Sequence, residues 1–128
     1  MSKRESEFKS QFFDTLRSKC PGFYLLRYGT RAAPDWTIIG AGRQTNWEFK
    51  HATPEFTSSG DQELMCMRLA QAGHCRYVIW WETSRGTGHR TMIVHPRRVF
   101  DKSLTPEEWT EGVDHPWLVE RVKRAHRL

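Results

Sequence analysis

PDWTIIGAGRQTNWEFK, residues 34–50, contains two short apolar segments separated by a stretch with two glycines. WTII at 36–39 and NWEFK at 46–50 have the length and the β-branched and aromatic composition of strands. The six residues between them, 40–45, supply glycines that permit a reversal of the chain. The pattern therefore predicts an antiparallel hairpin with a six-residue turn.

Alternation along that hairpin sorts its side chains between two faces. Trp47 and Phe49 are expected on one face, and Glu48 and Lys50 on the other. In the simplest register, with residue 39 opposite residue 46, Asp35 lies opposite Lys50, on the same face as Glu48 and diagonal to it. Diagonal neighbours lie about 7–8 Å apart, so the two carboxylates are expected to flank one cation.

Two carboxylates on one face repel each other unless positive charge separates them. A hard divalent ion such as Mg²⁺ takes oxygen ligands, keeps water in its other positions and suits phosphate substrates. It lowers the pKa of a bound water, and Lys50 is placed to orient that water or to neutralise developing charge. Asp35, Glu48 and Lys50 thus predict phosphodiester hydrolysis. The ordinary alternative is a turn aspartate after proline and a solvated strand face.

The other periodic segments predict an α/β or α+β chain with a sheet flanked by helices. Phe8, Phe12 and Leu16 recur every four residues and predict a helix over 2–19. Further strands are predicted at 23–27, 76–81 and 90–95, the last two as a hairpin, and further helices at 61–72, from Thr105 and from Asp114.

Composition fits one domain of 128 residues with a polyanionic partner, since the net charge is +5 and the pI about 9.4. Cys20, Cys66 and Cys75 have no metal-binding spacing and are expected as reduced, mostly buried thiols. There is no apolar run of membrane-spanning length and no signal-peptide core at the N-terminus, so a cytoplasmic location is expected.

Pro34-Asp35, followed after 12 intervening residues by Glu48-Phe49-Lys50, resembles the signature of the PD-(D/E)XK nucleases. The surrounding sequence is similar to their VRR-NUC and Holliday junction resolvase branch. Glu7 matches that branch's glutamate early in the first helix, and Gln62 its glutamine opening the helix after the E-x-K strand. The resemblance covers roughly residues 4 to 82 and departs from the pattern at 32–33, where two alanines replace a glycine.

The resemblance implies a restriction-endonuclease-like core with a mixed β-sheet of four to five strands flanked by helices. The core would span about 4–95, with a helical extension over about 96–128. It also implies a Mg²⁺- or Mn²⁺-dependent endonuclease without a small-molecule cofactor. Asp35, Glu48, the Phe49 carbonyl and Glu7 would hold metal, while Lys50 and Gln62 complete the catalytic site. Its relatives suggest branched DNA such as Holliday junctions as substrate, a homodimer, and a bacterial or phage-infected cell.

Candidate nucleic-acid contacts fall in two places. Arg27, Thr30 and Arg31 occupy positions where resolvase-like relatives contact substrate. The basic tail is expected either to follow a phosphate backbone or to form the solvated face of an amphipathic helix; it contains Lys123, Arg124 and Arg127. For Glu7 and Gln62 the alternatives are an exposed helical glutamate and an ordinary helix-start residue.

Three other functions are consistent with the sequence. One is a nickase or exonuclease on linear or single-stranded DNA, and another is a non-catalytic nucleic-acid-binding module on a nuclease-like fold. The third is a protein-binding or regulatory factor whose basic surface is incidental.

Overall fold

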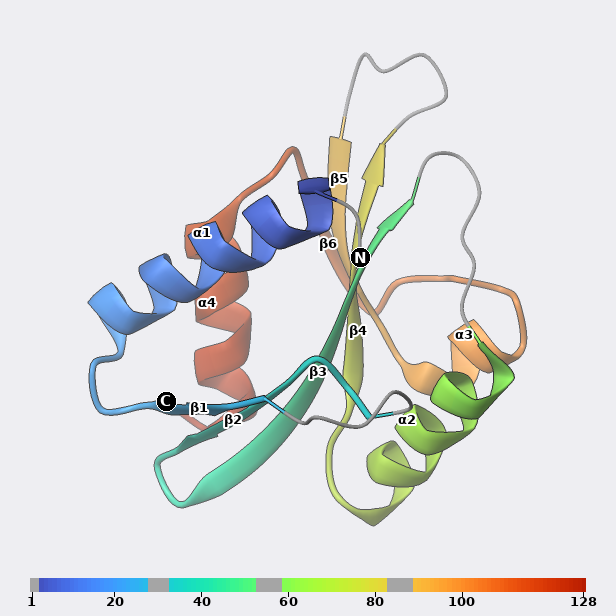
Figure 1. Cartoon of the computed structure of the whole chain (residues 1–128), viewed down its shortest axis with the longest axis horizontal. Helices are drawn as coiled ribbons and strands as arrows, with labels where there is room; N and C mark the ends of the chain where they lie inside the picture. The colour runs from blue at the N-terminus through green and yellow to red at the C-terminus, as the bar shows by residue number, and fades with distance from the viewer. Residues whose placement is uncertain (1–2, 28–32, 53–58, 83–88) are drawn as a thin grey trace.

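The computed structural model describes residues 3–27, 33–52, 59–82 and 89–128, which form one six-stranded sheet with helices on both faces (Figure 1). The strands run in the order β1-β2-β3-β4-β5-β6 across the sheet. The strands are β1 Tyr24–Leu26, β2 Trp36–Gly40, β3 Arg43–Ala52, β4 Arg76–Glu82, β5 His89–Val94 and β6 Glu108–Glu111. The helices are α1 Lys3–Lys19, α2 Gly60–Ala72, α3 Pro96–Phe100 and α4 His115–Ala125.

The sheet is mixed, as predicted, but has six strands instead of four or five. β3 and β4 pair in parallel, and the other neighbouring pairs are antiparallel. A parallel pair needs a crossover connection, and α2 lies in the connection between β3 and β4. The α/β class and the hairpin of β4 with β5 are therefore confirmed.

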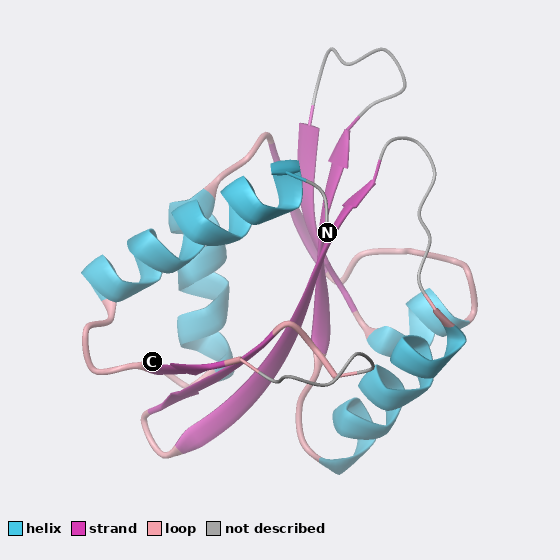
Figure 2. Cartoon of the chain, in the orientation of Figure 1, coloured by secondary structure: helices cyan, strands magenta, loops and turns pink. Residues whose placement is uncertain are grey.

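Two helical layers cover the sheet, with α1 and α4 on one face and α2 and α3 on the other (Figures 1 and 2). Each layer seals its own apolar core. Phe8, Phe12 and Leu16 of α1 pack with Trp47 and Phe49 of β3 on the first face. On the second face the core is built around Cys66, Cys75, Tyr77, Ile79 and Val94. Both faces of β3 are thus buried.

Local signals explain where α2 begins and ends. The Ser59 hydroxyl accepts a hydrogen bond from the Gln62 N–H (3.2 Å) and so caps the helix. The Gly73 N–H donates to the Leu69 carbonyl (2.9 Å) at the other end. The helix predicted over 61–72 is confirmed to within one residue.

The register of the β2–β3 hairpin differs from the predicted one. Ala41 and Gly42 form a two-residue turn with φ of 53° and 74°, the backbone that matches the twist of a tight hairpin. Trp36 therefore pairs with Trp47, where the predicted register pairs residue 36 with 49. A shift of two residues keeps every side chain on its face, so the predicted separation of Glu48 from Phe49 holds.

The helix predicted from Thr105 is wrong, because β6 occupies this segment. The Glu107 N–H donates to the Ile93 carbonyl (2.8 Å), and the next residues pair with β5. Gly112, with φ of 77°, ends the strand after four residues. The helix predicted from Asp114 is confirmed: its side chain caps α4 by accepting from the Trp117 N–H (2.8 Å).

The C-terminal third contributes to the same sheet and core as the rest of the chain. Leu118, Val119 and Val122 of α4 are buried against α1 and the sheet. The buried His126 side chain binds the Gly40 carbonyl through Nδ1 (2.8 Å) and the Thr45 hydroxyl through Nε2 (2.8 Å). These bonds attach the end of α4 to the β2–β3 hairpin.

The three cysteines are free and buried, as predicted. None of the helices in the described part of the chain is long and apolar enough to cross a membrane.

Candidate active site

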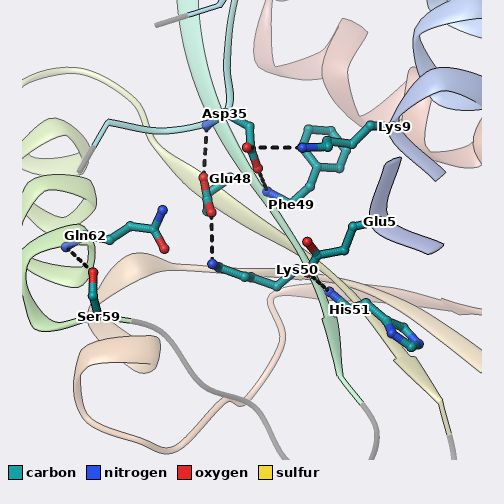
Figure 3. A network of polar contacts seen from close by, with 9 residues as sticks. All are labelled: Glu5, Lys9, Asp35, Glu48, Phe49, Lys50, His51, Ser59 and Gln62. Atoms are coloured by element: carbon teal, nitrogen blue, oxygen red, sulfur yellow. Dashed lines mark hydrogen bonds and ion pairs between the residues drawn. The ribbon is translucent and has the colours of Figure 1, made fainter. Parts of the chain in front are cut away.

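β2 and β3 separate at the end of their ladder and leave a fork in the sheet. Pairing ends at Trp36 and Trp47, while β3 continues to Ala52 along β4. Carboxylates take the place of β2 beyond that point: the Phe49 N–H donates to Asp35 Oδ2 (2.9 Å) and the His51 N–H donates to Glu5 Oε1 (3.0 Å). We call this region the β2–β3 fork; it comprises Glu5, Lys9, Asp35, Glu48, Phe49 and Lys50 (Figure 3).

The structure brings Asp35, Glu48 and Lys50 together at the fork. The Asp35 N–H donates to Glu48 Oε1 (2.9 Å), and Lys50 Nζ lies 3.3 Å from Glu48 Oε2. The observed register, continued by one residue, sets Asp35 directly opposite Glu48 instead of opposite Lys50. Directly opposite residues are nearer to each other than diagonal ones, so the Asp35 and Glu48 positions are closer than the predicted register placed them.

Lys9 supplies a second ammonium group to the fork. Its Nζ lies 3.2 Å from Asp35 Oδ1, and the residue is only 7% exposed. Buried charges are costly unless they are paired, so this contact holds both side chains in place. The fork gathers three carboxylates, from Glu5, Asp35 and Glu48, and two ammonium groups.

Burial, and after it the neighbouring charge of Asp35, raise the pKa of Glu48 to about 8. The Lys50 ammonium opposes both effects and does not overcome them. The Glu48 side chain, 2% exposed, therefore retains a proton near neutral pH unless additional positive charge arrives. A divalent cation would provide that charge, so the fork's chemistry fits a metal ion.

The donor set at the fork is composed of oxygen, which suits Mg²⁺ or Mn²⁺. Asp35 and Glu48 offer carboxylates, and the N–H and carbonyl of one strand residue share an edge, so the Phe49 carbonyl points to the Asp35 side. Across the described ranges no three His, Cys, Asp or Glu side chains form a metal-holding group. Mg²⁺ nonetheless commonly binds to only one or two carboxylates, with water and phosphate oxygens in its remaining coordination positions.

Gln62 approaches the fork from the opposite helical layer. Its side chain extends from the first turn of α2 toward Glu48 and Lys50 (Figure 3), and the residue is buried. Because the backbone N–H of Gln62 is bound to Ser59, the side-chain amide is not needed for capping.

Glu7, the glutamate predicted for the site, is exposed and does not join the fork. Successive α-helical residues turn by about 100°, so Glu7 lies about 200° around α1 from Glu5. Glu5 and Lys9 are the α1 residues that reach β3 and Asp35. The apolar stripe of Phe8 and Phe12 indicates that positions 5 and 9 lie beside the packed face of α1, but it does not indicate that either residue reaches the fork.

The predicted nucleic-acid contacts are dispersed. Arg27 is exposed at the end of β1, whereas Thr30 and Arg31 lie outside the described residues. The basic tail at the end of α4 lies near the turn of the β2–β3 hairpin, and Asp35 is at the other end of that hairpin. Lys123 pairs with Glu120 (3.5 Å), Arg124 approaches Glu108 (3.8 Å), and Arg127 is exposed.

No protein-family model matches this sequence, and the comparison with curated proteins gives no match. Among solved structures the chain is similar to Hjc, a Holliday junction resolvase from the archaeal hyperthermophile Archaeoglobus fulgidus. The two share 14% sequence identity with a TM-score of 0.49, over 89% of this chain and 88% of that one. A likeness of this degree does not define the chemistry of the fork, which follows from its own residues.

Proposed function

We propose that the protein is a divalent-metal-dependent endodeoxyribonuclease that acts on branched DNA, such as Holliday junctions, as a homodimer. The observation that carries the proposal is the meeting of Asp35 with the buried Glu48, whose carboxylate accepts from the Asp35 N–H and has the Lys50 ammonium 3.3 Å away. Such a group of charges is unfavourable for folding alone and is typical of sites that bind a cation and a phosphate.

Asp35, Glu48 and the Phe49 carbonyl would hold Mg²⁺ or Mn²⁺. The ion, when bound, supplies a water of lowered pKa and positive charge for the phosphate. Lys50 donates hydrogen bonds from its ammonium to the attacking water or to a phosphate oxygen, which stabilises charge that develops during attack. Gln62 orients the same water or a phosphate oxygen through its side-chain amide. Glu5 keeps the edge of β3 in place through the His51 N–H.

The choice of branched DNA and of a dimer is supported by the sequence resemblance to the resolvase branch and by the net charge of +5. Resolving a junction requires two cuts, so one site in each of two symmetric subunits suits the reaction. The basic tail supplies additional positive charge away from the fork.

The test compares a labelled four-way junction with a linear duplex of the same sequence, in Mg²⁺ and in EDTA. We expect the junction to be cut faster in Mg²⁺ and neither substrate to be cut in EDTA. Asp35→Asn, Glu48→Gln and Lys50→Ala should each reduce the cleavage rate by about 100-fold or more. Asp101→Asn, which changes an exposed carboxylate just after α3, is the matched control and should cleave at the wild-type rate.

Cleavage that survives EDTA and Asp35→Asn would contradict the metal site. Equal rates on the junction and the duplex would favour a nickase or exonuclease on linear DNA. Binding without cleavage in either Mg²⁺ or Mn²⁺ would identify a non-catalytic DNA-binding module.

A further inference from the structure

A cavity of about 270 Å³ adjoins the β2–β3 fork between α1 and the strands β1 and β2. Its walls include Ser6, Lys9, Ser10 and Arg17 of α1, together with Arg27 and Trp36. We call it the α1 cavity. Lys9 belongs to both places, since it lines the cavity and its ammonium also contacts Asp35. A ligand in the cavity therefore lies next to the proposed metal site.

The sequence of α1 accounts for this wall. Ser6, Ser10 and Arg17 are spaced by four and seven residues, so they share one side of the helix. This polar side runs beside the apolar stripe that packs on β3. The same helix thus seals the core with one face and lines the cavity with the next.

Positive charge dominates the cavity. Lys9, Arg17 and Arg27 line it, and no carboxylate is among its described lining residues. Asp14 lies 3.6 Å from Arg17, but both side chains are more than half exposed, so this pair is weak and leaves Arg17 available. An anion with several oxygen atoms, such as a phosphate group, is the complementary ligand.

An aromatic surface completes the cavity. Trp36 is half-buried, and the ring of the buried Phe13 lies against it with 4.2 Å between centroids. Phe13 therefore fixes the indole, while another part of the indole lines the cavity. A fixed aromatic ring beside basic side chains is the arrangement that binds single-stranded nucleic acid, with bases stacked and phosphates paired.

We propose that the α1 cavity binds one unpaired nucleotide of the DNA strand beside the scissile phosphate, with its phosphate at Arg17 and Arg27 and its base against Trp36. This subsite rests on the proposed nuclease function. It specifies an unpaired nucleotide as the feature of branched DNA that the enzyme recognises. The cavity is slightly smaller than the roughly 300 Å³ at which drug-sized pockets begin, so it admits a single nucleotide but not a duplex. Bases within a continuous duplex are stacked on their neighbours and cannot reach Trp36.

The test measures binding of a fluorescently labelled (dT)8 oligonucleotide by anisotropy in EDTA, where cleavage does not interfere. We expect Arg17→Ala and Arg27→Ala each to weaken binding by about fivefold or more. Each should also reduce the slope of log affinity against log salt concentration by about one, the equivalent of one phosphate contact. Trp36→Leu should weaken binding similarly, and Trp36→Phe should retain most of it. Arg97→Ala, which removes an exposed arginine from α3, is the control and should bind within about twofold of wild type.

Wild-type affinity in Arg17→Ala, Arg27→Ala and Trp36→Leu together would overturn the subsite. Equal competition by a blunt duplex and by (dT)8 would overturn the preference for an unpaired nucleotide. Thermal unfolding of each variant identifies any loss that comes from misfolding, and the two arginine variants do not disturb the core.

The same variants separate this proposal from the proposed function. Normal cleavage by wild type, with unchanged (dT)8 binding in all three variants, refutes the subsite and leaves the nuclease. Variant-sensitive binding with no cleavage under any metal refutes the nuclease and leaves the subsite. Asp35→Asn that binds (dT)8 in EDTA but no longer cleaves DNA supports both.

Discussion

Glu5 and Glu7 are two residues apart on α1 and point in nearly opposite directions. Glu5 accepts a hydrogen bond from the His51 N–H, on the edge of β3 that also carries Phe49. Glu7 is exposed. The contribution of α1 to the fork therefore depends on Glu5, which fixes the strand edge and adds negative charge near the candidate metal ligands.

Glu5→Ala and Glu7→Ala form a matched pair that tests this difference. We expect Glu5→Ala to lower the Mg²⁺-dependent cleavage rate by about tenfold or more, because it frees the β3 edge at His51, next to Lys50 and Phe49. Glu7→Ala should stay within about twofold of wild type, since an exposed helical glutamate contributes little. Glu5→Gln keeps the hydrogen-bond acceptor and removes the charge, so its rate separates the two contributions. Equal losses in both alanine variants would contradict the assignment.

Asp35, Glu48 and Lys50 were predictable as a cluster from the sequence, because alternation fixes their face whatever the exact register. Lys9 was not predictable in the same way. A lysine beside an apolar helical stripe is usually a solvated residue at the edge of the helix. Its role depends on Asp35 reaching back from the start of β2, which is a tertiary contact between residues 26 positions apart.

The β2–β3 hairpin shows what limits prediction at the level of elements. The stretch between the two apolar segments predicts a turn of six residues, but Ala41 and Gly42 turn the chain alone. Strand pairing then extends over Arg43 to Thr45, which are too polar to predict as strand. β6 was missed because its start has the residues of a helix cap, whereas the unpaired edge of β5 decides its conformation.

The tight turn gives a prediction about stability. Ala41 has φ of 53°, a left-handed conformation that asparagine tolerates better than alanine, and Asn-Gly is the preferred pair for this turn. We expect Ala41→Asn to raise the free energy of unfolding by about 0.5–1 kcal/mol. Gly42→Ala, at φ of 74°, should lower it by about 1 kcal/mol.

Urea denaturation of both turn variants provides the measurement. The turn lies at the other end of β2 from Asp35, so DNA cleavage by the folded variants should match wild type. A loss of stability in Ala41→Asn would show that this backbone conformation is not the one populated in solution.

At the scale of the whole molecule, the sheet and its two helical layers place a charged site between two apolar cores. Glu48 lies on the face of β3 that α2 covers, while Trp47 and Phe49 on the opposite face hold α1. The alternation of NWEFK predicts this division, but not that both faces are buried. Burial of the second face depends on α2 returning over the sheet, and it is burial that raises the pKa of Glu48.

The raised pKa of Glu48, about 8 against an ordinary value of 4.5, links folding to pH. Between these values the unfolded chain has lost the Glu48 proton and the native protein keeps it, so the native state binds more protons. The contribution of Glu48 to stability is therefore complete below about pH 4.5 and is lost as the pH rises to about 8. Glu48→Gln, which cannot ionise, lacks this contribution, so its unfolding free energy in EDTA should fall less than that of wild type across the same range.

Divalent metal should reverse the effect, because it binds the ionised carboxylates and the proton competes with it. We expect Mg²⁺ to raise the unfolding free energy of wild type more at pH 8 than at pH 5.5, and to have little effect on Glu48→Gln at either pH. Urea denaturation of both proteins, with Mg²⁺ and with EDTA, measures all the required values. Parallel pH profiles for wild type and Glu48→Gln in EDTA would mean that Glu48 is ionised in the native state. The two ammonium groups of Lys9 and Lys50 would then be sufficient to balance the fork, and the electrostatic reason for a metal ion there would be removed.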